Sequence, residues 1–426
     1  MTSIYFETAG CPANFADSEL MAGLLKQAKF EIVNNIDEAY IVILNTCTIK
    51  SPTETSFFKR LKEVEELEQR KLIIVAGCVP QINSKQLKKY PLIGPNQIHN
   101  VVEVVEEALN DNVIKLLARE EKPPLNIPRI RNSPLISIIP ISRGCQGNCT
   151  FCITKAARGH LASYPIDQIV QETKSALKDG AKEIWLTSHD NGCYGIDLNT
   201  NLAQLLQELV KIPPEFKLRI DDINPEHLLK YLDQFLVVFA SEKIYKYLSL
   251  PVQSGNNEIL KSMNRNYTAE QFTQLTKKIK DRFPQTTIST DLIVGYPGET
   301  DEQHWETLNL IREVSPDVIN ISKFWPRPST AAVLLKTLSE EVIQDRFSSL
   351  ASICQNITIL QNEKWVGWEG YVVINEKSPE EKQWIGRNFA YKPILVEGNF
   401  KLGDIVKVKI KINKHLPLEL RGEIVA

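Results

Sequence analysis

The sequence lacks the features that mark a secreted or membrane protein. Its first residues, MTSIYFETAG, contain no basic segment followed by an apolar run, so they do not resemble a signal peptide. No apolar run approaches the roughly 18 residues that are needed to cross a bilayer. We therefore predict a cytoplasmic protein with no membrane partner. In that compartment thiols stay reduced, so its eight cysteines are expected to be ligands or core residues rather than disulfides.

The chain also lacks an excess of charge of either sign, internal repeats and low-complexity segments. Fifty Lys and Arg residues against 52 Asp and Glu residues give a net charge of −2. The overall charge thus gives no indication of a nucleic-acid partner, and a polyanion would have to bind a local basic patch. With 43% apolar residues among 426, the chain has enough core to fold without disulfides, and its length suggests two to four domains.

What is present, first, is a regular alternation of strand and helix patterns over the first hundred residues. Strand patterns end in SIYFETAG, AYIVILNTC and KLIIVAGC, and helical patterns separate them. The near-continuous apolar runs are typical of parallel strands that are covered on both faces. This pattern predicts a small doubly wound parallel sheet. Single cysteines, Cys11, Cys47 and Cys78, lie just past its three strands.

Two further units follow a proline-rich segment, KPPLNIPRIRNSP. Six strand patterns alternate with helices, which is fewer than the eight of a closed β/α barrel, and so they predict a partly open six-stranded barrel. A long helical segment then leads to a β-rich tail, which predicts a five-stranded barrel of the oligonucleotide-binding kind. The expected division is an N-terminal domain at 1–118, a linker at 119–134, the β/α barrel at 135–358 and the small barrel at 359–426.

Three of the cysteines lie together in the loop GCQGNCTFC, as Cys145, Cys149 and Cys152. The loop follows the first predicted barrel strand, and its glycines expose backbone N–H groups that can stabilise the sulfurs of an anionic cluster. Three thiolates can hold three irons of a [4Fe–4S] cluster and leave the fourth iron open for chemistry. The alternatives are a structural zinc with a fourth ligand from elsewhere in the chain, or buried thiols without a ligand.

The three single cysteines have two interpretations. Each, taken alone, is expected to be a small buried residue. The carboxyl ends of parallel strands, however, form one edge of the sheet, where ligands bind. Three thiols at that edge repeat the number in the barrel loop and favour a second [4Fe–4S] cluster with an open iron.

The CxxxCxxC loop after the first barrel strand resembles that of the radical S-adenosylmethionine (SAM) enzymes. Together with the three preceding cysteines and a tail resembling the TRAM domain, the chain resembles the methylthiotransferases over nearly its whole length. The resemblance is carried by GCPANFADSE, NTCTIKSPTE, AGCVPQ, GCQGNCTFC, PVQSG, MNRNYT, DLIVGYPGETDE and GRNFAYKPILVEG. It implies that SAM fills the open iron of the barrel cluster and is cleaved to a 5′-deoxyadenosyl radical. It also implies that the second cluster carries the sulfur, which a SAM molecule methylates before a second SAM supplies the radical.

The segments CITKAARGHLASYP and NTCTIKSPTE resemble the archaeal and eukaryotic branch. That branch converts N6-threonylcarbamoyladenosine beside the tRNA anticodon to its 2-methylthio derivative. The implied partners are the anticodon arm of tRNA and an electron donor such as ferredoxin or flavodoxin. Alternatives within the family are isopentenyladenosine in tRNA or an aspartate of a ribosomal protein. An alternative of another class is a non-catalytic iron–sulfur protein that binds RNA or transfers electrons.

The chain departs from the pattern of this branch near the expected cofactor pocket. His189 stands where a glutamate is more usual, and Asp221 and Asp222 stand where a glycine and an apolar residue are expected. These differences bear on the contacts that the chain makes with the cofactor.

Further candidates for cofactor binding lie at or near the predicted barrel strand ends. Asp190 offers an acceptor for the amino group of the cofactor, and Gln253 and Ser254 offer groups for its ribose hydroxyls. Asp291 lies within a strand pattern, where a charge must be paired or line the barrel mouth. Arg158 is a candidate for the cofactor carboxylate or an RNA phosphate. The alternatives are a solvated loop residue for Asp190 and loop capping for Gln253 and Ser254. For Asp291 and Arg158 they are structural pairing and an ordinary salt bridge, respectively.

The tail places Lys407, Lys409 and Lys411 on one face of a predicted strand, in VKVKIKINK. A row of lysines on a small barrel suits the phosphate backbone of RNA. The alternative is an edge strand that is protected against aggregation. Cys193 and Cys354 have no partner pattern and are predicted to be ordinary residues.

Overall fold

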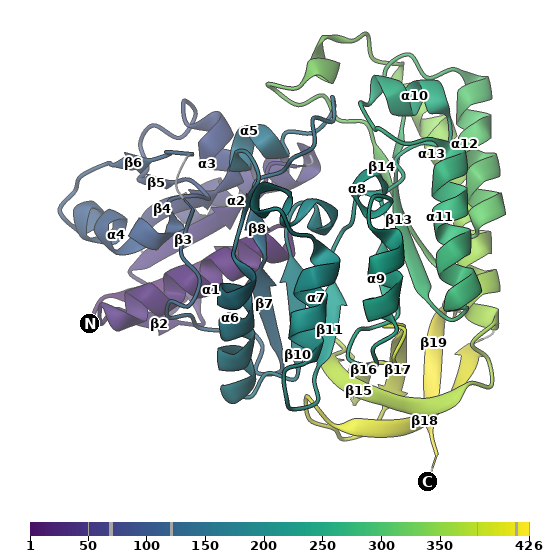
Figure 1. Cartoon of the computed structure of the whole chain (residues 1–426). Coiled ribbons are helices and arrows are strands. Elements are labelled where there is room, and N and C mark those ends of the chain that lie inside the picture. The colour runs from purple at the N-terminus through teal and green to yellow at the C-terminus, as the bar shows by residue number, and fades with distance from the viewer. Residues whose placement is uncertain (50, 68–70, 120–121, 381, 414–415, 426) are drawn as a thin grey trace.

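The structure is a computed structural model that describes the chain except for residues 50, 68–70, 120–121, 381, 414–415 and 426. It contains an N-terminal α/β unit, a central β/α barrel and a small C-terminal β-barrel. In Figure 1 the N-terminal sheet lies beside the central barrel, and the yellow C-terminal barrel lies below it.

The N-terminal unit is a six-stranded sheet in the order β2-β1-β3-β4-β5-β6, in which every neighbouring pair is parallel. Its strands are β1 Ser3–Thr8, β2 Glu31–Val33, β3 Ile41–Thr46, β4 Leu72–Gly77, β5 Leu92–Ile93 and β6 Lys115–Leu116. Apolar clusters cover both faces, which confirms the predicted doubly wound sheet. The short strands β2, β5 and β6 were not predicted, because two or three residues are too few to show a strand pattern.

The helices of this unit are α1 Pro12–Gln27, α2 Ser51–Glu65, α3 Cys78–Asn83 and α4 Val101–Leu109. The sequence predicts an amphipathic α1 that buries its leucines and methionine, and Leu20, Met21 and Leu25 are indeed buried. The helix differs from that prediction on its other face, where Asn14 and Asp17 are also fully buried. The reason is that α1 contacts the first strand of the central barrel as well as its own sheet.

The central unit contains the six predicted strands, all parallel to their neighbours. They are β7 Ile136–Pro140, β10 Glu183–Thr187, β11 Lys217–Ile220, β12 Tyr247–Ser249, β13 Thr287–Val294 and β14 Val318–Lys323. They form two three-stranded sheets, β7-β10-β11 and β12-β13-β14. Backbone hydrogen bonds on either side of Leu218 connect β11 to the segment before β12. The result is a partly open β/α barrel, as predicted.

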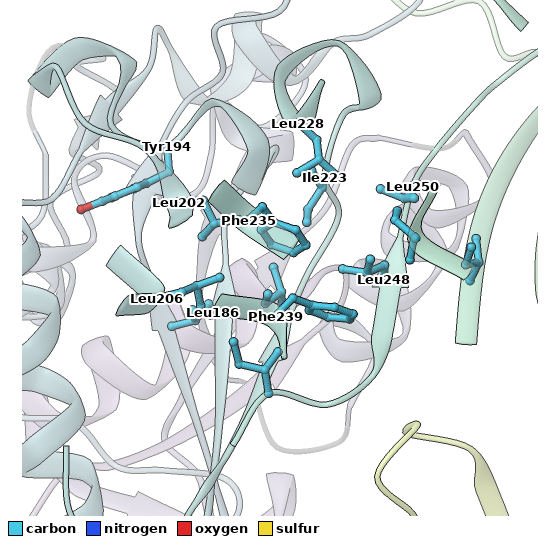
Figure 2. Packing of buried hydrophobic residues seen from close by; sticks show 14 of the residues in the cluster. Leu186, Tyr194, Leu202, Leu206, Ile223, Leu228, Phe235, Phe239, Leu248 and Leu250 are labelled. Carbon is cyan, nitrogen blue, oxygen red and sulfur yellow. The ribbon is translucent and has the colours of Figure 1, made fainter. Parts of the chain in front are cut away.

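Helices pack around these strands and bury their apolar faces against them. They are α5 Thr154–Arg158, α6 Ile166–Lys178, α7 Leu202–Val210, α8 Pro225–Leu228, α9 Leu232–Phe239, α10 Asn257–Ser262, α11 Ala269–Arg282, α12 Asp301–Val314 and α13 Glu340–Glu363. Figure 2 shows part of this core, where Phe235 and Phe239 of α9 lie among leucines from strands and neighbouring helices. The rings of these two phenylalanines are stacked with their centroids 5.3 Å apart. A rigid core of this kind fixes the strand ends, and so it positions the loops that follow them.

The C-terminal unit is a closed barrel in the order β15-β16-β17-β19-β18, which confirms the predicted five strands. They are β15 Glu369–Lys377, β16 Gln383–Arg387, β17 Pro393–Glu397, β18 Ile405–Asn413 and β19 Leu416–Ile424. Its interior contains Val372, Ile374, Val408 and Ile410. Helix α13 precedes it and runs through the expected limit at residue 358; the domain limits given above stay a prediction.

The small barrel docks where the strands of the central barrel begin. The backbone N–H of Lys246 donates to the carbonyl of Phe389 (2.8 Å), and Lys392 pairs with Asp317 (3.2 Å). The Tyr391 ring packs against Tyr245, with centroids 4.8 Å apart. The loop that carries Cys145, Cys149 and Cys152 follows a strand end, so it lies at the other end of the central barrel. Within the part of the chain that the structure describes, no helix combines the length and apolar character needed to cross a membrane.

Candidate metal centres

The cysteines of the loop after β7, called here the barrel trio (Cys145, Cys149 and Cys152), line one cavity. The cavity has a volume of about 410 Å³ and lies between the cysteine loop, α5 and residues 329–331. All three thiols are free and half-buried. The structure therefore brings the predicted ligands of the first cluster together around one space.

The backbone of this loop is held in place on both sides. Gly144 has a φ of +65°, and a Cβ added there would lie 2.0 Å from the carbonyl oxygen of His160. On the other side, the Thr150 hydroxyl donates to the carbonyl of Ser262 (2.9 Å), and the Asn264 amide donates to the carbonyl of Asn148 (2.9 Å). These contacts support the shape of the loop through both neighbouring segments.

The thiols of the barrel trio have different surroundings. The pKa of Cys152 is raised to about 11, chiefly by burial and also by the neighbouring Cys149. The pKa of Cys145 is lowered, chiefly because the Cys193 thiol hydrogen-bonds to it. Cys193, for which the sequence indicates no role, is fully buried, and its sulfur also lies 3.1 Å from the carbonyl oxygen of Asp190.

The other three cysteines, called here the rim trio (Cys11, Cys47 and Cys78), lie at the carboxyl ends of three adjacent strands. Cys11 follows β1, Cys47 follows β3, and Cys78 begins the helix after β4. These strands are neighbours in the sheet, as the prediction required. Burial raises the pKa of Cys47 to about 12, and the nearby thiols of Cys78 and Cys11 add to the shift. The three sulfurs therefore lie close enough to influence one another.

The residues present fit two iron–sulfur clusters. Each trio consists of free thiols, which are the ligands that such clusters use. A Cβ at Gly147 would lie 3.5 Å from the sulfur of Cys145 and 3.8 Å from that of Cys149, in the space that the thiols share. At Gly10 a Cβ would lie 2.6 Å from the Cβ of Cys47. Both sites thus have glycine where a side chain would occupy the space beside the sulfurs.

Arg158 lies between the two trios. It is the last residue of α5, directly after the barrel trio, yet its guanidinium contacts only the N-terminal unit among the hydrogen bonds of the described residues. It donates to Asn14 Oδ1 (2.7 Å), to Asp17 Oδ2 (2.8 Å) and to the sulfur of Cys78 (3.3 Å). The sequence predicts that Arg158 binds the cofactor carboxylate or an RNA phosphate; the structure places it against the rim trio.

Arg265 is the corresponding neighbour of the barrel trio. Its Nη1 lies 3.6 Å from the sulfur of Cys149, and it also donates to the Tyr267 hydroxyl (3.0 Å) and the Pro251 carbonyl (2.7 Å). The sequence analysis did not identify Arg265, although it lies in the MNRNYT segment. Each trio thus has one buried arginine beside one of its sulfurs.

Asp190, predicted to accept the amino group of the cofactor, is buried and hydrogen-bonded through both oxygens. Oδ1 accepts from the backbone N–H groups of Gly192 (2.8 Å) and Asn224 (2.9 Å). Oδ2 lies 2.6 Å from Nδ1 of His227, and this partner contributes to raising the pKa of that histidine against the opposing effect of burial. Asp190, Cys193 and His227 offer ligand atoms within 4.8 Å of one another, and the hydrogen bonds of Asp190 connect it with both of the others.

The other predicted cofactor residues lie on the second half of the barrel. Gln253 has a φ of +72° and forms backbone hydrogen bonds with β13. The Ser254 hydroxyl accepts from the backbone N–H of Asn256 (3.2 Å), which is loop capping. Asp291 is half-buried and accepts from the Asn320 amide (2.9 Å). Gln253 and Asp291 adjoin each other through the hydrogen bond from the Gln253 N–H to the Asp291 carbonyl (2.8 Å).

Asp221 and Asp222, where the sequence analysis expects a glycine and an apolar residue, follow β11 and lie near Asp291. Burial raises the pKa of Asp222 to about 7, and the charges of Asp221 and Asp291 contribute to the shift. Asp221 accepts from Thr187 (3.0 Å), and Asp222 accepts from Ser249 (2.6 Å). Since each of these carboxylates lies within reach of the others' charges, they form one acidic group in the barrel.

His189, the third residue that differs from the expected sequence pattern, lies near the positive charges of Arg158 and Arg143. Burial lowers its pKa well below the ordinary value, and Arg158 and Arg143 lower it further. Its Nδ1 is buried and has no hydrogen-bond partner in the part of the chain that the structure describes. Burial and the two arginines therefore favour the neutral form of His189.

The predicted lysine row lies on the outer face of β18. Lys409 and Lys411 are exposed and Lys407 half-buried, whereas Val408 and Ile410 between them point into the barrel. Lys407 pairs with Glu369 (2.8 Å) and Lys411 with Glu423 (2.5 Å). The strand thus presents the three lysines on one face, and their role in RNA binding stays a prediction.

Comparisons with known proteins agree with this arrangement. Residues 139–311 match the model of the radical SAM superfamily, and residues 3–93 match that of the uncharacterized protein family UPF0004. A solved structure of the radical SAM methyltransferase TsrM from Kitasatospora setae, with cobalamin and a [4Fe–4S] cluster bound, has a TM-score of 0.55 at 13% identity. The match covers 78% of this chain and 74% of that one, and it shows likeness of fold.

Two curated relatives match nearly the whole chain. The "Probable threonylcarbamoyladenosine tRNA methylthiotransferase" of Pyrococcus abyssi is 39% identical over 95% of this chain and 97% of that protein. The human "Threonylcarbamoyladenosine tRNA methylthiotransferase" is 37% identical over 96% of this chain and 72% of that protein. Identity of this level and extent shows the family. The chain belongs to the radical SAM threonylcarbamoyladenosine tRNA methylthiotransferases.

Proposed function

We propose that this chain converts N6-threonylcarbamoyladenosine beside the tRNA anticodon to its 2-methylthio derivative. The observation that carries the proposal is the pair of cysteine trios, one in a single loop of the barrel and one at the carboxyl ends of three parallel strands, with Arg158 of the barrel against Cys78 of the rim trio. Three thiols at each place leave room for a reacting ligand at both, which sulfur insertion requires. The substrate is taken from the names of the relatives.

In this proposal the barrel trio holds the cluster that binds SAM, and the rim trio holds a second cluster for the transferred sulfur. When bound, these groups supply the radical and the sulfur that the unreactive C2 carbon of adenosine needs. The chain's own residues hold the thiols in place. Gly144 and Thr150 set the shape of the barrel loop, and Arg265 offers N–H groups to the sulfur of Cys149.

The remaining assignments are parts of the same proposal. Gln253 and Asp291, adjacent at the barrel mouth, are in a position to contact the cofactor. Ser254 and Asp190 support the loops there through their hydrogen bonds. The anticodon arm of tRNA is the proposed partner of the lysine row on β18. A cytoplasmic location and an electron donor such as ferredoxin or flavodoxin complete the proposal.

The test is anaerobic reconstitution of the full chain, followed by incubation with tRNA that carries threonylcarbamoyladenosine. We expect about eight irons per chain, which corresponds to two [4Fe–4S] clusters. Under reducing conditions with SAM, we expect 5′-deoxyadenosine and a methylthiolated nucleoside detected by mass spectrometry.

Each of the other outcomes supports one of the alternative functions. Four irons or fewer, or no cleavage of SAM, would support a non-catalytic iron–sulfur protein. A further outcome is full iron content with methylthiolation only of tRNA carrying isopentenyladenosine, or only of a ribosomal protein. This outcome would refute the proposed substrate and leave the proposed reaction in place.

A further inference from the structure

Arg158 is part of a barrel helix in the sequence, but its side chain contacts the N-terminal unit. It follows Cys152 by six residues, and its side chain is fully buried. Its three hydrogen-bond acceptors all belong to the N-terminal unit: Asn14, Asp17 and the sulfur of Cys78. One planar guanidinium thus connects the first turns of α1 to the third cysteine of the rim trio.

Arg143 provides a comparison within the same interface. It is also buried and also pairs with Asp17, and it donates to the Tyr164 hydroxyl (3.3 Å). The hydrogen bonds of Arg143 in the described residues include no cysteine sulfur. Asp17 therefore balances two arginines, of which one touches a thiol of the rim trio and the other does not.

We propose that Arg158 is a positioning residue of the rim trio, which fixes Cys78 against α1 and raises the reduction potential of a cluster bound there. This inference rests on the proposed function, because it requires a cluster at the rim trio. A hydrogen bond to a cysteine sulfur and a nearby positive charge both stabilise the more negative, reduced state of a cluster. The low dielectric of a buried interface strengthens both effects.

The experiment isolates the rim cluster in the full chain. Replacing Cys145, Cys149 and Cys152 by alanine removes the barrel site, so that reconstituted iron reports the rim trio alone. In this background we compare Arg158→Gln and Arg143→Gln with the parent by iron content and by redox titration followed by electron paramagnetic resonance. Each substitution removes one buried cation from Asp17, but only the first removes a contact to sulfur.

We expect about four irons per chain in the parent, corresponding to one [4Fe–4S] cluster. We expect a more negative midpoint potential in Arg158→Gln and a smaller shift in Arg143→Gln, which removes a charge but no hydrogen bond to sulfur. Arg158→Lys keeps the charge and should recover part of the shift. An unchanged potential in Arg158→Gln, or an equal shift in Arg143→Gln, would overturn the inference and leave the proposed function intact. Absence of iron from the parent would overturn both.

A second variant covers the case in which Arg158→Gln does not fold. Asp17→Asn leaves the cysteines and both arginines in place and removes the negative charge that balances them. The potential of the rim cluster should then become more positive. A potential that stays the same or becomes more negative would contradict the role given to Arg158.

Discussion

Gly144 determines, at the scale of a single residue, whether the cysteine loop can form. Its φ of +65° disfavours any side chain, and a Cβ would meet the backbone of His160 at 2.0 Å. Because the obstacle is backbone, it cannot rotate away. We predict that Gly144→Ala loses the iron of the barrel trio, about half of the total, and with it the cleavage of SAM, as measured by iron analysis and 5′-deoxyadenosine formation.

Gly180 is the matched control for this substitution. It has a φ of +99°, but a Cβ there would meet nothing within 4 Å. Gly180→Ala should therefore incur only the conformational cost of about 1–2 kcal/mol and keep its full iron content. If both variants lose iron equally, backbone strain in general, and not the clash with His160, would be the cause.

The residues that bear cysteine ligands could be predicted from the sequence, whereas their neighbours could not. Cys145, Cys149 and Cys152 lie within eight residues, so their proximity is a property of local sequence. Arg158 and Asn14 are 144 residues apart, and no local pattern connects them. The contact of Cys193 with Cys145 likewise depends on where two barrel loops meet.

Helix α1 illustrates what burial on two faces does to a charged residue. Glu19 accepts from the backbone N–H of Asn132 (3.0 Å) through Oε1, while Oε2 is buried and has no partner in the described part of the chain. Burial raises the pKa of Glu19 from 4.5 to about 7. The folded chain therefore favours the protonated carboxyl, and it loses stability as the pH rises from about 4.5 through 7. The loss is of the order of 3 kcal/mol above pH 7.

We accordingly predict that Glu19→Gln stabilises the chain, and more so at pH 8.5 than at pH 5.5. The amide keeps an oxygen for the Asn132 N–H and cannot ionise. Thermal unfolding of the two proteins at both pH values measures the effect. Glu103→Gln, at an exposed position of α4, should show no such pH-dependent difference. A gain that is the same at both pH values would show that the ionisation of Glu19 is not the cause.

Strand β18 allows a test of RNA binding at the scale of one element. Replacing Lys407, Lys409 and Lys411 by glutamine removes three outward charges and leaves the inward valine and isoleucine in place. Each phosphate contact contributes about 0.7–0.9 to the slope of log affinity against log salt. We predict weaker tRNA binding and a slope smaller by about 2–3, measured by filter binding over a salt series.

Cleavage of SAM in the absence of RNA should be unchanged in this variant, because β18 is remote from both trios. Neutralising the exposed Lys174 and Lys178 of α6 and Lys211, directly after α7, provides the matched control for lost charge. Equal weakening in the two triple variants would mean that the overall charge, and not the lysine row, governs binding.

In the whole molecule, the docking of the small barrel depends on a few buried contacts. Lys392 and Asp317 are each about 4% exposed or less, and Asp317 also pairs with Lys280 (2.9 Å). Breaking a buried pair usually costs about 3–5 kcal/mol, and Lys280 will reduce this cost. We predict that Lys392→Met speeds tryptic cleavage between the two barrels, whereas Lys401→Met, at an exposed position of the small barrel, does not. Cleavage at the rate of the parent would contradict a role for this pair in docking.

The sequence predicts the three units of the molecule but not how they meet. Strand periodicity and the strand-end cysteines identify each unit, because these signals are local. The docking of the small barrel at the strand-start end depends on single contacts, such as Tyr391 against Tyr245, that join distant segments. The acidic group of Asp221, Asp222 and Asp291 depends in the same way on the closure of two half-barrels.

The position of the Tyr391 ring has a consequence for how cofactor and substrate enter the barrel and how products leave it. With Trp185, Tyr245 and Tyr247 it fills the start of the central barrel, around the cation of Arg219. In the described part of the chain these side chains pack the end where the strands begin, whereas a cavity lined by the barrel trio lies at the other end. In the proposed reaction, the cleaved cofactor is released at the same end of the barrel at which the next cofactor and the nucleoside bind. The order in which cofactor and nucleoside bind and products are released then affects the turnover rate, in addition to the chemical step.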